Sequence, residues 1–563
     1  MKKLVIGVDF GSDSARAIVM NALTGEKLGS SICEYPRWME GKYSDSSQNI
    51  FRQHPSDYLE ALENSVKEAL KKSGNNAGEY VVGLAVDSTG STPAPVNNKG
   101  VPLALLPEFA DNPNAMFYMW KDHSAIEEAK EINHVFSTFG EEDYTRFQGA
   151  YSSEWYWAKI LHAKNVDIEV TQSAPAWVEL SDWIPGLLAG NTNPRTMYRN
   201  ACAAGHKALW HSDFGGLPSK EILYSIDPYL AEVADNFGGP PRTADAKLGT
   251  ICTEWAKRLG INTNAVIGGS SFDAHAGAVG AGIKPGVLVK VIGTSTVDML
   301  IAERDVVRGK DIQDVCGQAE NSIVPGYIGI ESGQAAFGDM FSWFRRVLIW
   351  SAKDCINTID SISEEDKKNI VKAYYNNLIS NIEKEASITE EDMSLIAVDW
   401  FNGRRYPKIN ESVRGILCGM NLGTTATQIY KALAASTVFG SRRIFDSFVA
   451  KGIKIDSVIA VGGIAQKSPY IMQLLADVIK RPIMVSKSEQ SCAMGAAIYA
   501  AVAANIYSSI LEAEQYMCDG FVSTYSPNSK NFAKYDLLYQ KYLNLGRHEE
   551  SIQLEEENMS VSH

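Results

Sequence analysis

Two stretches of the sequence decide the fold: residues 5–20, VIGVDFGSDSARAIVM, and residues 291–300, VIGTSTVDML. In each stretch an apolar run ends in a turn rich in glycine and hydroxyl side chains, and a second apolar run follows. This pattern predicts two antiparallel strands joined by a tight turn. Because the pattern heads each half of the chain, we expect a duplicated domain; the wide spacing excludes a solenoid, whose repeats are much shorter.

The segments that follow each stretch extend the prediction to a whole domain. After a third strand at residues 27–34 come a helix with one apolar face, which starts at Pro55, and an apolar strand at residues 80–86. Strands in this order, with helices between them, predict a mixed sheet covered by helices. Near the end of the chain, a strand at residues 456–461 leads into Gly462-Gly463 and a further helix.

Length and composition agree with two α/β domains. The chain has 563 residues, which is more than one hydrophobic core usually organises, and 45% of them are hydrophobic. Residues 491–510 carry no charge, but their branched side chains form one narrow stripe, which favours a packed core helix over a membrane span. We expect an N-terminal domain at residues 1–269, a C-terminal domain at 270–545 with a helical insertion at about 351–394, and a disordered acidic tail at 546–563.

Charge and cysteine usage narrow the class of protein. The formal net charge of −14 disfavours nucleic acid or an anionic membrane as the main partner. The eight cysteines are scattered without a CxxC pair, which indicates reduced thiols in a cytoplasmic protein. The sequence leaves the oligomeric state open, a homodimer included.

The first turn carries residue types that bind phosphate. Glycine lets the backbone approach a ligand closely, and the surrounding hydroxyl and N–H groups suit phosphate oxygens. Asp9, at the end of the preceding strand, is a candidate ligand for hydrated Mg²⁺. An ordinary hairpin turn is the alternative for one such motif, but two of them facing each other would bind a polyphosphate from both sides. The candidate phosphate-binding residues are Gly11, Ser12, Asp13 and Ser14 in the first turn and Gly293, Thr294 and Ser295 in the second.

Two other places suit a nucleotide and a catalytic base. Gly462-Gly463 lies between a strand and a helix, where α/β proteins often bind nucleotides, although a plain connection explains it equally well. Asp273 follows an apolar strand and is either a helix N-cap or a general base that accepts the proton of an attacking hydroxyl. The small-residue helix around residues 493–497 is either a flat floor for adenine or simple close packing.

Four elements, namely the two turns, Gly462-Gly463 and the segment at Asp273, resemble those of the FGGY carbohydrate kinases in order and spacing. The resemblance covers nearly the whole chain. It implies two ribonuclease H-like domains of the actin and hexokinase superfamily, with ATP bound in the cleft between them. It also implies that both turns are phosphate loops, that Gly462-Gly463 lies against the adenosine and that Asp273 is the catalytic base. Mg²⁺ would be held by Asp9 and, through water, by Asp273.

Longer motifs are similar to the L-ribulokinase branch of that family: YPRW at residues 35–38, QHPSDY at 53–58, GHK at 205–207 and ESGQAAFGD at 331–339. This likeness implies ATP-dependent phosphorylation of L-ribulose at its 5-hydroxyl, a step of L-arabinose catabolism. The sugar site that it implies consists of Ala94, Trp120, Asp122, Lys207, Asp273 and Glu331.

Some alternatives stay open. Arg404 stands where the family has glutamate, so any role tied to that glutamate is in doubt. Ser124 stands where many family members have arginine, a departure that agrees with the ribulokinase branch. Because a few hydrogen bonds select the sugar, D-ribulose, xylulose, ribitol or glycerol is an alternative acceptor. The alternative of another class is a non-catalytic sensor that binds nucleotide or sugar with the same hinged fold.

Overall fold

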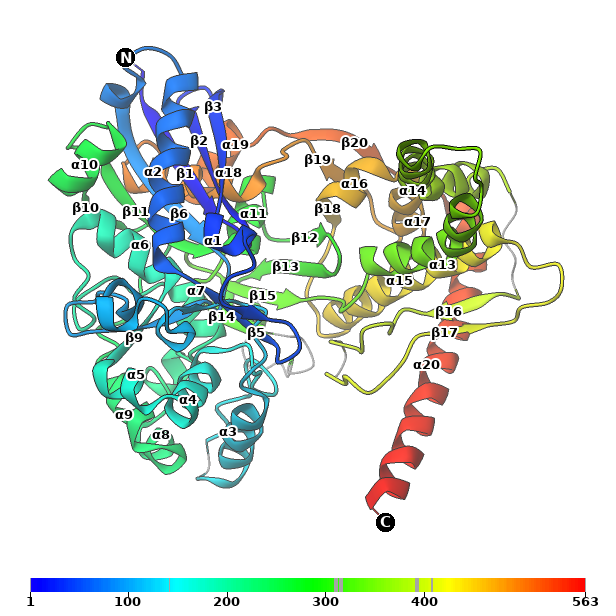
Figure 1. The fold of residues 1–563 in the computed structure, drawn as a ribbon, viewed down its shortest axis with the longest axis horizontal. Coiled ribbons are helices and arrows are strands. Elements are labelled where there is room, and N and C mark those ends of the chain that lie inside the picture. Colours follow the sequence, from blue (N-terminus) through cyan, green and yellow to red (C-terminus); the bar gives the residue numbers. More distant parts are fainter. Residues whose placement is uncertain are drawn as a thin grey trace.

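The computed structural model describes residues 2–140, 142–307, 312, 317–389, 394–406 and 409–561, with backbone alone for 555–561. Two sheets organise the molecule, one in each lobe (Figure 1). The first sheet has the order β10-β11-β6-β1-β2-β3. Its strands are β1 (Leu4–Phe10), β2 (Ser14–Asn21), β3 (Lys27–Glu34), β6 (Val81–Ser88), β10 (Lys247–Thr250) and β11 (Val266–Phe272).

The first sheet confirms the predicted meander. β1, β2 and β3 pair antiparallel in sequence order, and β6 then joins β1 in parallel. β11 extends the parallel part beyond β6. α2 (Pro55–Lys72) connects the meander to β6 and packs its buried face against β2 and β3. The carboxyl ends of β1, β6 and β11 therefore meet at one edge of this sheet.

The second sheet repeats this arrangement with the order β14-β15-β13-β12-β18-β19-β20. β12 and β13 form the predicted antiparallel hairpin, and β18 pairs with β12 in parallel, as β6 does with β1. The duplicated strand pattern predicted from the sequence is thus confirmed. Its strands are β12 (Val287–Ile292), β13 (Thr296–Ala302), β14 (Gly317–Glu320), β15 (Ile328–Ser332), β18 (Ser457–Val461), β19 (Ile483–Ser486) and β20 (Phe521–Tyr525).

Two small-residue helices lie between the sheets: α11 (Asp273–Ala281) and α18 (Ser491–Ala503). A Cβ atom built on Gly7 of β1 would lie 1.9 Å from the carbonyl oxygen of Ala493, and one on Gly495 would lie 1.9 Å from that of Ala276. Only glycine permits these backbone contacts. Close packing is therefore the role of the helix around residues 493–497.

The chain division differs from the expected one in two places. The expected boundary between residues 269 and 270 falls inside β11, so the first domain includes that whole strand. α18 and α19 (Ile510–Met517) return to the first lobe, where Figure 1 shows them in orange beside the blue strands. Among the described residues, no helix is both long enough and apolar enough to cross a membrane.

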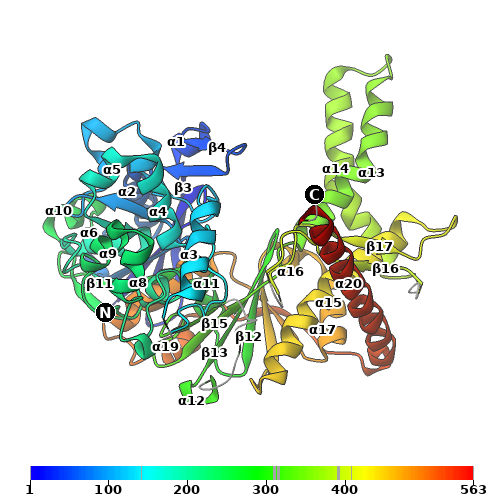
Figure 2. The same ribbon diagram turned by 90° about the horizontal axis from the view of Figure 1, so that it is seen from below.

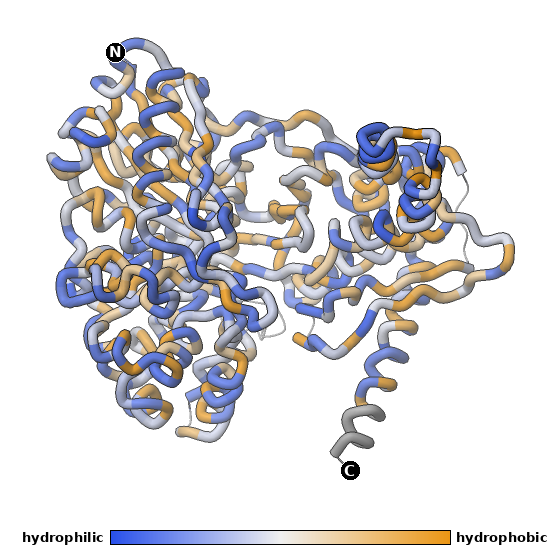
Figure 3. The backbone as a smooth tube through the Cα atoms, viewed as in Figure 1, coloured by the Kyte–Doolittle hydropathy of each residue, from blue (hydrophilic) through white to orange (hydrophobic). Residues whose placement is uncertain are grey.

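The insertion is a helical hairpin that projects from the second lobe (Figure 2). It consists of α13 (Gly338–Asn357) and α14 (Glu364–Ala386), so it starts earlier than residue 351. Most of α14 is exposed, and its coil is largely hydrophilic in Figure 3. The acidic tail is not disordered as expected, because α20 (Phe532–Val561) continues through it as one helix.

Shorter elements complete the two lobes. In the first lobe they are α1 (Pro36–Met39), β4 (Ser44–Asp45), β5 (Ile50–Gln53), β7 (Pro93–Val96), β8 (Phe117–Tyr118), α3 (Ile126–Thr138), α4 (Tyr156–Val166), α5 (Ile168–Ser173), β9 (Ala176–Glu179), α6 (Leu180–Ala189), α7 (Ala201–His206), α8 (Lys220–Ile226), α9 (Pro228–Asp235) and α10 (Thr253–Leu259). In the second they are α12 (Arg304–Val307), β16 (Ile396–Val398), β17 (Ile416–Cys418), α15 (Ala426–Ala450), α16 (Gly463–Lys467) and α17 (Pro469–Ile479).

Candidate active site

Three carboxyl groups gather at the edge where the parallel strands of the first sheet end. Asp9 and Asp87 stand opposite each other in the β1–β6 register, and Asp273 begins α11 directly after β11. Asp9 and Asp87 are buried, and Oδ1 of Asp9 and both carboxyl oxygens of Asp87 have no hydrogen-bond partner among the described residues. Arg16 supplies positive charge from β2, with Nη1 3.2 Å from Oδ2 of Asp9.

Burial and mutual repulsion raise the pKa of each carboxyl group. For Asp273, burial and the nearby charge of Asp9 raise the pKa to about 7. The pKa of Asp87 rises well above its ordinary value because the group is buried beside Asp9 and Asp273. Burial also raises the pKa of Asp9, although Arg16 opposes the rise. Such a cluster binds protons or a cation readily.

The first turn is held on both sides. The N–H of Gly11 donates to the carbonyl of Ser14 at 3.0 Å and closes the hairpin. Gln53 donates to the carbonyl of Ser12, and Nε1 of Trp120 donates to the Ser12 hydroxyl at 2.9 Å. Asp13 is exposed and accepts from the Ser14 hydroxyl. Trp120, predicted as a sugar ligand, is therefore tied to the first turn.

The second turn rests on a buried ion pair. Lys290 donates to both carboxyl oxygens of Asp298, at 2.9 and 3.0 Å, and to Oε1 of Gln334. Gly293 and Thr294 at the tip are exposed, while their carbonyls accept from the N–H groups of residues 337–339 at the start of α13. The base of the turn is thus fixed by buried contacts, while its tip is open to solvent.

Gly462-Gly463 lies beside this second turn. Gly462 has φ +107°, and a Cβ there would lie 2.5 Å from the carbonyl oxygen of Ile292, so glycine is required on both counts. A Cβ on Gly463 would meet nothing within 4 Å. A Cβ on Gly338 would contact both Gly293 and Ile464. One continuous surface is therefore formed by the second turn, Gly462-Gly463 and the start of α13.

On its other side Asp273 adjoins a second polar group. His275 lies two residues after Asp273 on α11, and its Nε2 is 2.9 Å from Oε2 of Glu331 on β15. The carboxyl of Glu331 is buried, which raises its pKa, but Lys207 and His275 outweigh this and hold the pKa far below its usual range. Glu331 is thus an anion, and its side chain is a quarter exposed. Lys207 lies over the rings of Trp155 and Phe272, next to Asp273.

Two predicted sugar ligands are placed differently. Asp122 is fully buried and forms an ion pair with Arg52 on β5, and it also accepts from the N–H of Phe51 and from Ser124. Arg52 also donates to the Ser124 hydroxyl at 3.2 Å. Because both carboxyl oxygens of Asp122 have protein partners, the described contacts give it a structural role and lend no support to direct sugar binding. The Ala94 side chain is also fully buried, in the first core, which leaves only its main chain for a ligand.

Comparison with known proteins decides the family. The C-terminal domain of the FGGY family of carbohydrate kinases matches residues 288–504. A protein named ribulokinase from Vibrio parahaemolyticus is 43% identical over 97% of this chain and 96% of its own. A ribulokinase from Geobacillus thermodenitrificans is 34% identical over 97% of this chain and 94% of its own. The chain belongs to the FGGY family of carbohydrate kinases.

Solved structures of FGGY kinases share the fold. A xylulose kinase from Rhodospirillum rubrum superposes with a TM-score of 0.78 at 16% identity, over 98% of this chain and 99% of that one. A glycerol kinase from Plasmodium falciparum, solved with ADP, gives a TM-score of 0.74 at 16% identity, over 97% of this chain and 98% of that one. The predicted actin and hexokinase-like fold is confirmed, and the chain is a carbohydrate kinase.

Several site residues of this FGGY kinase escaped the sequence analysis. Asp87 is the clearest, and its signal was present: DSTG at residues 87–90 ends a strand just as DFGS does at residues 9–12. Arg16 lies on β2, two residues after Ser14 of the first turn, and no sequence pattern marked it as a site residue. His275 looked structural, but it connects Glu331 to Cys202, whose Sγ is 2.7 Å from Nδ1.

Arg404 takes a structural place in this chain. Its guanidinium pairs with Glu550 of α20, which the expected disordered tail would not have supplied. The arginine that replaces the family's glutamate thus contacts the C-terminal helix. Pro407, the end of that family segment, lies outside the described residues.

Proposed function

We propose that this kinase transfers the γ-phosphoryl group of ATP to the 5-hydroxyl of L-ribulose. Relatives that are named ribulokinase cover nearly the full chain at 43% and 34% identity, whereas the solved xylulose and glycerol kinases are only 16% identical. The observation that carries the mechanism is the position of Asp273. It lies between a carboxyl cluster on one side and Glu331 with Lys207 on the other.

Asp273 is the proposed general base. The sugar hydroxyl oxygen forms a bond to the γ-phosphorus while the bond to the β,γ-bridging oxygen breaks and ADP leaves. The hydroxyl proton passes to the Asp273 carboxylate. A pKa of about 7 suits this task, because a base works best when its pKa is near the operating pH.

Glu331 and Lys207 are proposed to orient the sugar. The Glu331 carboxylate accepts hydrogen bonds from sugar hydroxyls, and the Lys207 ammonium donates to a sugar oxygen. His275 keeps Glu331 in one orientation by the hydrogen bond of 2.9 Å. Groups fixed in this way bring the reacting hydroxyl to the phosphorus with little loss of entropy in the reaction itself.

The two turns and Gly462-Gly463 are proposed to bind ATP. Their residues are Gly11, Ser12, Asp13 and Ser14 for one side of the phosphates, Gly293, Thr294 and Ser295 for the other, and Gly462 and Gly463 for the adenosine. No described hydrogen bond or ion pair joins the first turn to the second. Domain closure would bring them onto one polyphosphate and exclude water, which would otherwise hydrolyse ATP.

The carboxyl cluster fits Mg²⁺. Its unpartnered, buried carboxylate oxygens are hard donors, and the cluster holds more acidic groups than Arg16 can neutralise. Asp9 and Asp87 would hold the hydrated ion, with Asp273 reaching it through water. When bound, Mg²⁺ offsets the charge that spreads over the transferring phosphoryl group.

A substrate panel tests the proposed function. ADP release is measured with L-ribulose, D-ribulose, L- and D-xylulose, ribitol, glycerol and no sugar. We expect sugar-dependent ADP release with the highest kcat/KM for L-ribulose. A higher kcat/KM for another acceptor would reassign the substrate, and ATP turnover that no sugar stimulates would overturn the kinase mechanism.

A further inference from the structure

Three side chains, none of which the proposed mechanism places on ATP or on the sugar, form a compact buried cluster. Cys202 and His206 lie on α7 of the first lobe, and His275 lies on α11 between the lobes. Their exposed fractions are 1%, 1% and 0%. One ligand atom from each lies within 4.8 Å of the other two. Thiolate and imidazole are the ligands that Zn²⁺ and similar thiophilic ions prefer, whereas Mg²⁺ prefers oxygen.

The surroundings of this Cys202–His206–His275 cluster are those of a metal site. Nε2 of His275 is hydrogen-bonded to the Glu331 carboxylate at 2.9 Å, and Nε2 of His206 lies 3.1 Å from the Ser322 hydroxyl. Metal-binding histidines usually donate their second ring nitrogen to a carboxylate or another acceptor, which fixes tautomer and ring orientation. Both imidazoles are oriented here before any ion binds.

We propose that Cys202, His206 and His275 form a binding site for Zn²⁺ or a similar thiophilic divalent cation. The Cys202 thiol loses its proton to solvent when the metal–sulfur bond forms. Asp273 and Glu331, which adjoin the cluster, are partly exposed, so the cluster lies next to the proposed sugar site.

Metal binding in this site would slow the kinase, a consequence that rests on the proposed function. Sγ of Cys202 and Nδ1 of His275 are 2.7 Å apart. In a tetrahedral zinc site these atoms stand about 3.5 Å apart, given Zn–S near 2.3 Å and Zn–N near 2.0 Å. Either Cys202 on α7 or His275 on α11 must therefore move by a large fraction of an ångström, and a shift of His275 displaces the start of α11, which carries Asp273. A misplacement of about 1 Å in a catalytic group lowers turnover by about 100-fold.

Cobalt absorption tests the site without sugar or ATP, so its outcome does not depend on the proposed function. Co²⁺ is titrated into the full-length protein, and the thiolate-to-cobalt charge-transfer band is recorded and then displaced with Zn²⁺. We expect one equivalent of Co²⁺ per chain. The band should vanish in Cys202→Ser. In His206→Gln the affinity for Co²⁺ should fall at least tenfold. Cys355→Ser, which alters an exposed cysteine on α13, is the matched control and should keep the band.

The absence of a band in the wild-type protein, or an unchanged band in Cys202→Ser, would overturn the site. If that variant does not fold, anomalous diffraction from wild-type crystals soaked in Zn²⁺ decides instead: a peak among the three side chains supports the site, and peaks only elsewhere overturn it. In the kinase assay, one equivalent of Zn²⁺ should lower kcat at least tenfold in wild type and Cys355→Ser. Full turnover with the metal bound would overturn the inhibitory consequence.

Discussion

Asp273 is the residue at which the two halves of the site meet. Its carboxyl group feels the charge of Asp9 on one side and of Glu331 and His275 on the other. A neutral amide in its place keeps the shape but cannot accept a proton. We therefore expect Asp273→Asn to lower kcat by about 10²- to 10⁴-fold, the usual contribution of a general base. Coupled ADP release measures this loss.

Nucleotide binding supplies the control for that variant. Calorimetry with a non-hydrolysable ATP analogue should give an affinity within a few-fold of wild type, with an unchanged melting temperature. Near-normal phosphorylation of L-ribulose by Asp273→Asn would dismiss the residue as the base.

The raised pKa of Asp273 predicts the pH dependence of catalysis. The base must be ionised, so kcat/KM should rise as pH increases and level off above the folded-state pKa of about 7. Below that value the rate should fall about tenfold per pH unit, because kcat/KM reports the free enzyme. Steady-state kinetics between about pH 5 and 9 check the profile. A flat profile below pH 7 would contradict the assignment.

Asp87 offers a test of the cation site. Both of its carboxyl oxygens are buried without a described partner beside Asp9. Asp87→Asn removes repulsion, so the melting temperature should stay level or rise, while the Mg²⁺ concentration for half-maximal activity should increase about tenfold. Asp477→Asn is the contrasting control: Asp477 is equally buried but accepts from Gln473 and Asn528, so this variant should lose stability without changing the Mg²⁺ requirement. An unaltered Mg²⁺ requirement in Asp87→Asn would count against its metal role.

The sequence allowed part of this site to be predicted. Turns and strand ends are local patterns, so Asp9, Asp273 and both turns could be singled out as candidates from the sequence, whereas their roles came from the family resemblance and stay predictions. The pairing of Asp9 with Asp87 depends on strand order, which joins residues far apart in sequence. The ion pair of Asp122 could not be predicted for the same reason, since its partner Arg52 comes from another strand.

At the level of elements, the second phosphate loop depends on the buried ion pair of Lys290 and Asp298. Removing one partner of such a pair leaves an uncompensated buried charge. Lys290→Met should therefore lower the free energy of unfolding by about 3–5 kcal/mol, as measured by urea denaturation. Lys220→Met, which breaks an exposed pair with Asp235, is the matched control and should change it by at most about 1 kcal/mol. A loss below about 1 kcal/mol for Lys290→Met would show that the pair does not support the loop.

Sequence periodicity predicted which helices and strands exist better than it predicted the residues at which they begin and end. The meander, the second hairpin and α2 have strong local patterns and match their predictions. α13 begins before residue 351 because its first turn packs under the second phosphate loop, a contact between distant segments. α20 extends into an acidic segment that looked disordered, where Glu549 and Glu550 bind Arg414 and Arg404.

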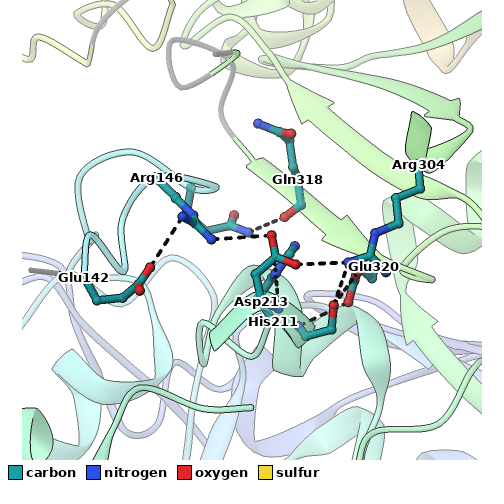
Figure 4. A network of polar contacts seen from close by, with 9 residues as sticks. Glu142, Arg146, His211, Asp213, Arg304, Gln318 and Glu320 are labelled. Atoms are coloured by element: carbon teal, nitrogen blue, oxygen red, sulfur yellow. Dashed lines mark hydrogen bonds and ion pairs between the residues drawn. The ribbon is translucent and has the colours of Figure 1, made fainter. Parts of the chain in front are cut away.

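For the whole molecule, a polar network joins residues of the first lobe to α12 and β14 (Figure 4). Asp213 of the first lobe accepts from Arg304 of α12 at 3.1 Å and lies 3.5 Å from Arg146. Arg304 also pairs with Glu320 of β14. Because Arg304, Asp213 and Arg146 are exposed by a third to a half, we infer that the network aligns the lobes rather than stabilising them strongly.

Closure of the lobes is the molecular-scale prediction. The two phosphate loops share no described contact, so ATP with sugar must draw them together. Small-angle X-ray scattering should show a smaller radius of gyration with L-ribulose and a non-hydrolysable ATP analogue than without ligands. Sugar alone serves as the comparison. An unchanged radius with both ligands would indicate that the loops act without closure.

The return of α18 to the first lobe has a consequence for biosynthesis. Gly7 and Gly83 of the first sheet lie against Ala493 and Ala500, which a ribosome adds only after most of the chain has emerged. Until then, the glycine-lined face of the N-terminal strands has no covering layer and stays open to water and to wrong partners. The first lobe therefore completes its core after synthesis is nearly finished, and truncation before residue 491 should yield an aggregating product rather than a folded half-molecule.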